Sequence, residues 1–451
     1  MYRAAFRLFV FVLVTAVGLG TVFPQSVEAA PGRGRKPNAN QEEVIPEIDP
    51  ALLGEEVDEI ERRTCVSIDE QAFFINEHPT CRERVLKRGK GEDAKEYKID
   101  GLLFNFRAVN AICDDRNPQT RAHWLYPDGP WDPERNTRAF IDALPYWQRS
   151  GADAFTVNLQ GGSPVGGASR VQHWHNSAFT RDGSLRADYM NRLERILDYA
   201  DRHHMVVILG LFSPGQDQNV WDERAVLRAV DAATDWLLER EYTNVLVEVA
   251  SACSDRRYDH DILTEDRVHE LLRRVQQRSE GQVDSPRGRF LVSASPGGGV
   301  LPPRSLLRVA DFALLHAGTV DDPGRIRRLV EHTRNRMRGS KKPILFNQDD
   351  HYNFQAEENH MMAAVLAYAG WGFHDWRRPG EGFHQGLDTP PVDWRPRSLR
   401  KYRFLQRLAE LTRHLPPYKT RTIREELKRE KAGREQSRAD SYPRPDPKGR
   451  R

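Results

Sequence analysis

The sequence lacks a strong excess of charge of either sign: 68 Lys and Arg stand against 65 Asp and Glu in 451 residues, a formal net charge of +3. This balance gives no reason to expect a nucleic-acid partner. Beyond the N-terminus, no apolar run is long enough to cross a bilayer. Neither Gly161-Gly162 nor Gly297-Gly298-Gly299 is followed by the Lys-Ser/Thr of a phosphate-binding loop, so both predict tight turns.

Cysteine is scarce as well, with four in the chain. Cys65 and Cys81 lie close together in sequence and are candidates to close a small loop. Cys113 and Cys253 each follow a predicted strand, which would place them on the same face of the fold. The spacing does not give the pairing, and four free thiols remain an alternative.

The first 30 residues have the pattern of a secretory signal peptide. Arg3 and Arg7 precede the apolar stretch Leu8–Phe23, and Val27-Glu28-Ala29 supplies a small-x-small cleavage site. The alternative is an uncleaved anchor, but the apolar stretch is short for a spanning helix. We therefore expect a secreted or periplasmic protein that has no membrane attachment after cleavage.

Composition divides the rest of the chain into three parts. Residues 31–96 are a linker and a charged N-terminal extension, 97–415 are the main domain, and 416–451 are a tail dense in Lys, Arg, Glu and Pro. A polymer-binding tail is one interpretation, but charge of mixed sign is typical of a solvated, disordered segment.

The main domain alternates short apolar runs with amphipathic helical stretches. The predicted strands are Ile99–Phe106, Ala154–Leu159, Val206–Leu211, Val245–Ala250, Phe290–Ala294, Phe312–His316, Ile344–Asn347 and Gly372–Asp375. About eight β/α repeats are typical of an α/β (β/α)8 TIM barrel. The alternative, a doubly wound open sheet, is disfavoured because no glycine fingerprint follows the first strand.

One stretch, Asn244–Asp255, organises the site prediction. Its apolar first half predicts a buried strand, and its polar second half predicts the loop at the strand's C-terminal end. Alternation places Glu248, Ala250 and Ala252 on one side of the chain. A carboxylate within an apolar strand is costly unless it is paired, so Glu248 requires partners inside a closed structure.

Asn244–Asp255 resembles strand four of the clan A glycoside hydrolases, the (β/α)8 enzymes that include the family 5 cellulases. That strand reads roughly V-x-x-E-x-x-N-E and ends in the general acid/base, while a Glu after strand seven is the nucleophile. Val245 and Glu248 match, but Ser251-Ala252 replace Asn-Glu. Around strand seven, Asn347-Gln348-Asp349-Asp350-His351 resembles N-E-D-D-H with Gln348 in the nucleophile's place. The resemblance implies that both catalytic glutamates are substituted.

The loops after the predicted strands carry the candidate site residues, because function gathers at that end of such barrels. The catalytic candidates are the substituted positions Ala252 and Gln348, together with Glu248, Asp349 and Asp350. The substrate-binding candidates are Arg107, Trp124, Trp131, Gln160, Trp174, His175, Ser251, Tyr258, His260, His316, Asn347, His351, Asp375, Trp376 and Glu381. Aromatic faces suit sugar rings, and amides and acids suit hydroxyls, although a single Trp is equally suited to packing a loop onto the barrel.

Two histidine-containing patterns raise the question of a metal. His173-x-His175 has no clear third ligand, and such pairs are more often hydrogen-bonding residues. Asp349-Asp350-His351 could also hold a divalent ion, but the family resemblance implies that this trio positions substrate and neighbouring side chains. We therefore expect neither a metal nor another cofactor.

Three functional hypotheses follow from these patterns. The first is a secreted glycoside hydrolase-like protein that binds an oligosaccharide or polysaccharide in the barrel cleft and is catalytically degenerate. The second is an active retaining glycosidase with relocated carboxylates, chiefly Asp349, Asp350 and Glu248, with Asp255, Asp259, Asp375 and Glu381 as further candidates. The third is a non-enzymatic scaffold that binds partners through its charged termini. The sequence gives neither the sugar nor the oligomeric state.

Overall fold

The computed structural model describes residues 61–163 and 172–441. The signal peptide expected in residues 1–30 and most of the linker therefore lie outside the described residues. Within the described part, no helix combines the length and the apolar character that crossing a membrane requires.

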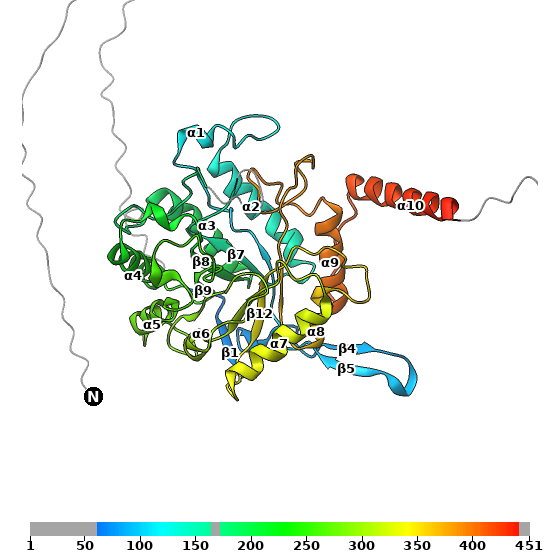
Figure 1. Ribbon diagram of the computed structural model, residues 1–451, viewed down its shortest axis with the longest axis horizontal. Helices are drawn as coiled ribbons and strands as arrows, with labels where there is room; N and C mark the ends of the chain where they lie inside the picture. Colours follow the sequence, from blue (N-terminus) through cyan, green and yellow to red (C-terminus); the bar gives the residue numbers. More distant parts are fainter. Residues whose placement is uncertain (1–60, 164–171, 442–451) are drawn as a thin grey trace, which may run out of the picture. The chain divides into compact units, whose positions relative to one another are not determined.

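Eight parallel strands form the centre of the fold (Figure 1). They are β6 (Phe104–Arg107), β7 (Ala154–Asn158), β8 (Val206–Phe212), β9 (Val245–Ala250), β10 (Leu291–Ser293), β11 (Ala313–His316), β12 (Ile344–Gln348) and β13 (Trp371–Phe373). Six are hydrogen-bonded in the order β10-β9-β8-β7-β6-β13, and β11 pairs with β12.

Local contacts close these two groups of strands into a barrel. A parallel bridge between Leu345 and Gly370 joins β12 to the start of β13. On the other side, the Asp311 N–H donates to the Val292 carbonyl at 2.9 Å, which joins the approach to β11 to β10. The predicted (β/α)8 barrel is therefore confirmed.

A helix follows each barrel strand and covers its outer side. These helices are α2 (Pro133–Gln148), α3 (Ala187–Arg202), α4 (Glu223–Glu239), α5 (Val268–Ser279), α6 (Arg304–Val309), α7 (Pro323–Met337), α8 (His360–Leu366) and α9 (Leu399–Thr412). Loops carry α1 (Pro118–Arg121) and the 3₁₀ turns η2 (Gly91–Asp93), η3 (Asp217–Asn219) and η4 (Asp261–Leu263). Since helices cover the outside and side chains fill the inside, every residue of β8 and β9 is buried.

The N-terminal extension closes the barrel at the end where the strands begin. It forms two small antiparallel sheets, β1 (Val66–Asp69), β2 (Ala72–Ile75) and β3 (His78–Pro79), and β4 (Val85–Arg88) with β5 (Lys95–Lys98). Val66 and Phe73 join a core cluster that contains Ala154 and Val206, the first residues of two barrel strands. The rings of Phe73 and Phe312 also pack edge to face, with their centroids 5.7 Å apart. The extension thus provides the floor of the barrel.

The predicted tail begins as a helix, α10 (Arg421–Ser441). Ile423 in its first turn is buried, and Glu426 accepts a hydrogen bond from the Leu399 N–H at 3.0 Å. The start of this segment is therefore packed against α9 rather than solvated.

All four cysteines lie within the described residues, and the structure shows each as a free thiol. Cys113 and Cys253 are buried on loops after β6 and β9. The small loop closed by Cys65 and Cys81 is not formed.

Candidate functional site

A buried polar network lies inside the barrel near the C-terminal ends of the strands. Glu248 Oε1 on β9 accepts hydrogen bonds from Ser295 Oγ and Asn347 Nδ2, each at 2.6 Å. Asn347 Oδ1 on β12 accepts from Arg107 Nη1 on β6 at 2.6 Å. Arg107 Nη1 also lies 3.8 Å from Glu248 Oε2. These are the partners that the sequence requires for Glu248, and they tie together three of the barrel strands and Ser295, two residues beyond β10.

This network contains one cation, the Arg107 guanidinium, and one anion, the Glu248 carboxylate. Burial lowers the pKa of the Arg107 guanidinium, and the Glu248 carboxylate counteracts that shift by favouring the charged form. Removing either partner would leave a buried charge without compensation. Glu248 has no exposed surface, so its position is that of a structural residue rather than an attacking group.

Ala252 and Gln348, the positions at which the sequence resemblance expects the two catalytic glutamates, lie around this network. Gln348 is the last residue of β12, and Ala252 follows β9 by two residues. The Ala252 N–H donates to Ser295 Oγ at 3.2 Å, and Asn347 Nδ2 lies 3.4 Å from the same oxygen. Ser295 therefore links the segments that carry the two positions. Ala252 has a φ of +51°, a left-handed conformation outside the strand, so the alternation expected from β9 does not reach it.

Gln348 is held by His316 of the neighbouring strand. The two residues are register partners, and the Gln348 amide nitrogen contacts His316 Nε2. Burial, reinforced by Arg107 and His374, lowers the pKa of His316 to about 3. His316 Nδ1 accepts from the Gly318 N–H at 3.1 Å, so the proton of the neutral imidazole is on Nε2, where the side-chain oxygen of the Gln348 amide is the group that accepts it. This pair needs no charge on either member.

This shift predicts acid-sensitive folding. In the unfolded chain His316 takes up a proton below its ordinary pKa of 6.5, whereas in the folded protein it stays neutral down to about pH 3. Because the unfolded state then binds more protons, stability is full above pH 6.5 and falls as the pH drops toward 3. We expect wild type to lose roughly 3 kcal/mol more than His316→Gln between neutral pH and about pH 4, measured by urea unfolding. If the free energy of unfolding depends on pH equally in the two proteins, the lowered pKa does not belong to His316.

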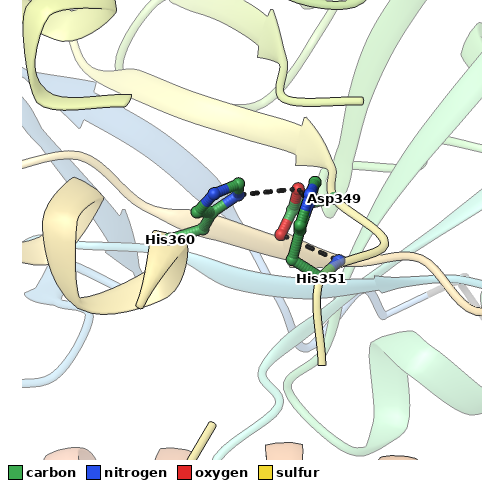
Figure 2. A group of neighbouring side chains, drawn as sticks. All are labelled: Asp349, His351 and His360. Carbon is green, nitrogen blue, oxygen red and sulfur yellow. Dashed lines mark hydrogen bonds and ion pairs between the residues drawn. The ribbon is translucent and has the colours of Figure 1, made fainter. Parts of the chain in front are cut away.

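Asp349, immediately after β12, is buried between two histidines (Figure 2). Asp349 Oδ1 lies 2.8 Å from His351 Nδ1 and 3.3 Å from His360 Nδ1. The hydrogen bond to Asp349 raises the pKa of His351. Asp350 has a further partner of its own: its Oδ2 accepts from Trp376 Nε1 at 3.3 Å.

A second histidine–carboxylate pair at the barrel mouth was missed by sequence reasoning. His374 Nε2, just after β13, lies 3.1 Å from Asp388 Oδ2, and Asn110 Nδ2 donates to Asp388 Oδ1 at 2.7 Å. His374 also contributes to the lowered pKa of His316. The prediction continued the last strand to Asp375 and so selected Asp375 in place of His374. The signal that was overlooked is the position directly after the apolar run Trp371–Phe373.

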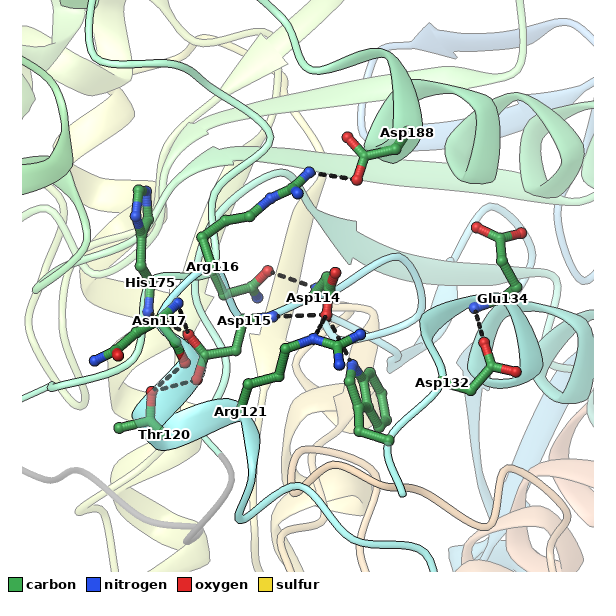
Figure 3. A network of polar contacts seen from close by, with 12 residues as sticks. Asp114, Asp115, Arg116, Asn117, Thr120, Arg121, Asp132, Glu134, His175 and Asp188 are labelled. Carbon is green, nitrogen blue, oxygen red and sulfur yellow. Dashed lines mark hydrogen bonds and ion pairs between the residues drawn. The ribbon is translucent and has the colours of Figure 1, made fainter. Parts of the chain in front are cut away.

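Polar groups on the loop after β6 are occupied with one another (Figure 3). Asp114 Oδ1 accepts from Arg121 Nε at 2.9 Å and from Trp131 Nε1 at 3.0 Å. Asp115 Oδ1 accepts from the His175 N–H at 2.8 Å, which ties this loop to the loop after β7. These carboxylates shape the mouth of the barrel instead of facing a ligand.

Three of the predicted sugar-stacking residues form a small core between loops. Trp124, Trp131 and Trp174 are buried together with Cys113 and Tyr126. The Trp131 ring stacks on Tyr126 and lies edge to face with Trp124, which is the packing alternative considered for each Trp, whereas Trp174 also lines a groove at the barrel mouth. The tryptophan most open to solvent is Trp221, at the end of the loop after β8, with 67% of its surface exposed.

The other predicted binding residues make structural contacts. Gln160 Nε2 donates to Ser177 Oγ at 2.9 Å, and Tyr258 OH donates to the Ser251 carbonyl at 2.7 Å. Arg400 on α9 pairs with two of them. Its Nη2 lies 2.8 Å from Asp375 Oδ1, and its two terminal nitrogens donate to the two carboxylate oxygens of Glu381. His260 Nδ1 lies 3.0 Å from the buried Asp217, which raises the pKa of His260.

A polar groove of about 550 Å³ opens at the C-terminal side of the barrel, between the loops after β6, β7, β8 and β9. Its lining consists of Asn117, Gln172, His173, Trp174, His175, Gly215, Gln218, Asn219, Arg257 and Asp259. The volume lies within the range typical of small-molecule sites. A hollow of about 560 Å³ lies beside Arg62–Cys65 and Tyr242, at the floor, away from the strand ends where (β/α)8 barrels carry their sites.

No family model matches the chain, and no curated protein does. Among solved structures, the chain is similar to a family 5 glycoside hydrolase from Bacteroides vulgatus ATCC 8482, at 12% identity over 76% of this chain and 70% of that one, with a TM-score of 0.45. It is similar to a β-1,4-D-mannanase from Cryptopygus antarcticus, at 12% identity over 80% and 99% of the two chains, with a TM-score of 0.44. A family 5 xyloglucan-specific endo-β-1,4-glucanase from a metagenomic library, in complex with cellotriose, matches at 12% identity over 68% and 96%, with a TM-score of 0.43.

Proposed function

We propose that this protein binds an oligosaccharide or polysaccharide in the groove at the barrel mouth and does not hydrolyse it by the retaining mechanism. One observation carries the proposal: Ala252 and Gln348 occupy the ends of β9 and β12 around an intact buried network. That arrangement preserves the scaffold of a site while removing the groups that would react.

Retaining hydrolysis requires two carboxyl groups about 5–5.5 Å apart, one to attack and one to transfer the proton. Gln348 cannot ionise and is already paired with His316. Ala252 has no titratable group. In the groove, Asn117 and Gln218 each donate one hydrogen bond to a backbone carbonyl and keep a second amide hydrogen, which suits a sugar hydroxyl.

Relocated catalysis has little chemical support from the three chief candidates, Glu248, Asp349 and Asp350. Glu248 and Asp349 are buried and paired with Arg107 and two histidines respectively. Asp350 is partly exposed and therefore is the remaining candidate. A single carboxylate does not complete the retaining pair.

The proposal is tested with a panel of soluble oligosaccharides. A ligand present at about 100 times its Kd stabilises the folded state by roughly 2.7 kcal/mol, so at least one glycan should raise the Tm. Release of reducing ends from that glycan should stay at background. Steady release that is abolished in Asp350→Asn would instead establish relocated catalysis. No stabilisation by any glycan would favour the scaffold hypothesis, in which the charged termini bind partners.

Trp221 is expected to add a stacking surface beside the groove. It lies two residues beyond Asn219 of the groove wall and is largely exposed. Stacking on a sugar ring is an apolar contact, so Trp221→Ala should weaken glycan binding by roughly tenfold, measured by calorimetry. Leu125→Ala, which removes another exposed apolar side chain outside the groove lining, is the matched control. Equal affinities of the two variants would remove Trp221 from the site.

We also propose that the protein is exported, on the basis of the N-terminal charge, apolar stretch and cleavage pattern. N-terminal sequencing of the mature protein should begin near Pro31. Recovery of intact Met1 in a membrane fraction would contradict cleavage.

A further inference from the structure

We propose that Asp349, His351 and His360 form a binding site for one divalent cation of the Zn²⁺ type. The site lies at the end of β12 and the start of α8, next to Gln348. It involves none of the residues that line the groove and does not depend on carbohydrate binding.

The donor atoms already converge. One carboxylate oxygen of Asp349 and one ring nitrogen of each histidine lie within 4.8 Å of one another. Zinc binds imidazole nitrogen and carboxylate oxygen at about 2.0–2.2 Å, so ligand atoms around a tetrahedral ion are about 3.4 Å apart. The Nδ1–Oδ1 separations of 2.8 Å for His351 and 3.3 Å for His360 are close to that spacing. Small outward movements of the side chains would admit the ion.

The ligand types select the class of cation. Two imidazoles and one carboxylate suit zinc and the neighbouring first-row divalent ions, whereas calcium and magnesium prefer sites built from oxygen alone. Three protein ligands also leave a fourth position for water, as in zinc sites that are not purely structural.

Surrounding contacts fix the orientation of the carboxylate. The His351 N–H donates to Asp349 Oδ2 at 3.2 Å, so the other oxygen, Oδ1, is the one directed at both histidines. His360 is only 2% exposed, and its ring lies edge to face with the Trp371 ring, with the two centroids 6.5 Å apart. Orientation of this kind is typical of groups that surround metal ligands, and burial restricts competing water.

The site has an entry path and a suitable charge. His351 is partly exposed, so an ion can reach the cluster from its side. Asp350 Oδ1 lies 3.9 Å from His351 Nδ1, and Asp321 Oδ1 lies 3.8 Å from His351 Nε2. These carboxylates add negative charge around the entrance, which favours a cation over a neutral or anionic ligand.

The test is Zn²⁺ titration of the untagged, metal-stripped protein by calorimetry, with Co²⁺ absorption as a spectroscopic probe. We expect one saturable Zn²⁺ per chain and visible Co²⁺ bands typical of nitrogen and oxygen ligands. His351→Ala should weaken Zn²⁺ binding by at least about tenfold, because loss of an outer-shell partner alone costs about 10–100-fold at known sites. The control is His78→Ala, which removes an exposed histidine of β3 in the N-terminal extension. This variant should bind Zn²⁺ as wild type does.

His351 is chosen because it is partly exposed, and its truncation should leave the fold intact where Asp349→Asn or His360→Ala would disturb buried contacts. An unchanged thermal midpoint of metal-free His351→Ala verifies this. Zn²⁺ binding that is equal in wild type and His351→Ala overturns the proposal, as does the absence of a saturable site in wild type. In either case the three residues form a hydrogen-bonded triad only.

Discussion

Arg107→Met should lower the free energy of unfolding by about 3–5 kcal/mol, because it leaves the buried Glu248 carboxylate without its cation. Methionine fills much of the same volume, so the loss reports charge and hydrogen bonding rather than a cavity. Asn347 Oδ1 also loses its donor. The change is measured from the midpoint and slope of urea unfolding.

The control is Arg267→Met, which changes a partly exposed residue immediately before α5. Arg267 pairs with Glu223 and Glu270 at 2.9 Å, yet exposed ion pairs contribute only about 0–1 kcal/mol. A second variant tests the cause: Arg107→Met combined with Glu248→Gln removes the unpaired charge and keeps an oxygen that can accept from Ser295 and Asn347. It should recover part of the lost stability. If the double variant is as unstable as the sum of the two single variants, the charges are not coupled.

The barrel could be predicted because its strands are continuous apolar runs. Val245–Ala250 was predicted with the bounds that β9 has, since both faces of this strand are buried. The first strand was predicted to begin at Ile99, but β6 begins at Phe104. Ile99 and Leu102 are buried in the packing between the extension and the barrel instead, as the Ile99 N–H bond to the Arg84 carbonyl shows. An apolar run does not reveal which surface it will cover.

The site was only partly predictable for a related reason. A charge inside an apolar strand must have partners, so burial and pairing of Glu248 followed from its position alone. Ser295 could not be identified, because its role depends on β10 being placed beside β9. The tryptophans were less predictable still: the composition of a loop is the same whether Trp124 packs inward or Trp221 projects outward. That choice is made by contacts between loops that are far apart in sequence.

Gln348→Glu should give the protein measurable activity on dinitrophenyl glycosides of a sugar that it binds. The leaving group of such a substrate departs without protonation, so a nucleophile alone is sufficient for the first step. The new carboxylate would stand beside His316 at the end of β12, where the side chain of Gln348 lies now. Release of dinitrophenolate is followed by absorbance and compared with wild type.

Unactivated oligosaccharides need the proton donor as well. Ala252→Glu added to Gln348→Glu should raise their hydrolysis by a further factor of about 10²–10⁴, the usual contribution of general acid/base help. Ala252 already adopts a left-handed backbone, so the substitution introduces no new strain of that kind. Gln348→Ala, purified in the same way, controls for contaminating glycosidases. If glycan binding is retained but neither variant hydrolyses any substrate above this control, then the ends of β9 and β12 do not face the bound sugar, and the groove serves recognition from a different side of the barrel mouth.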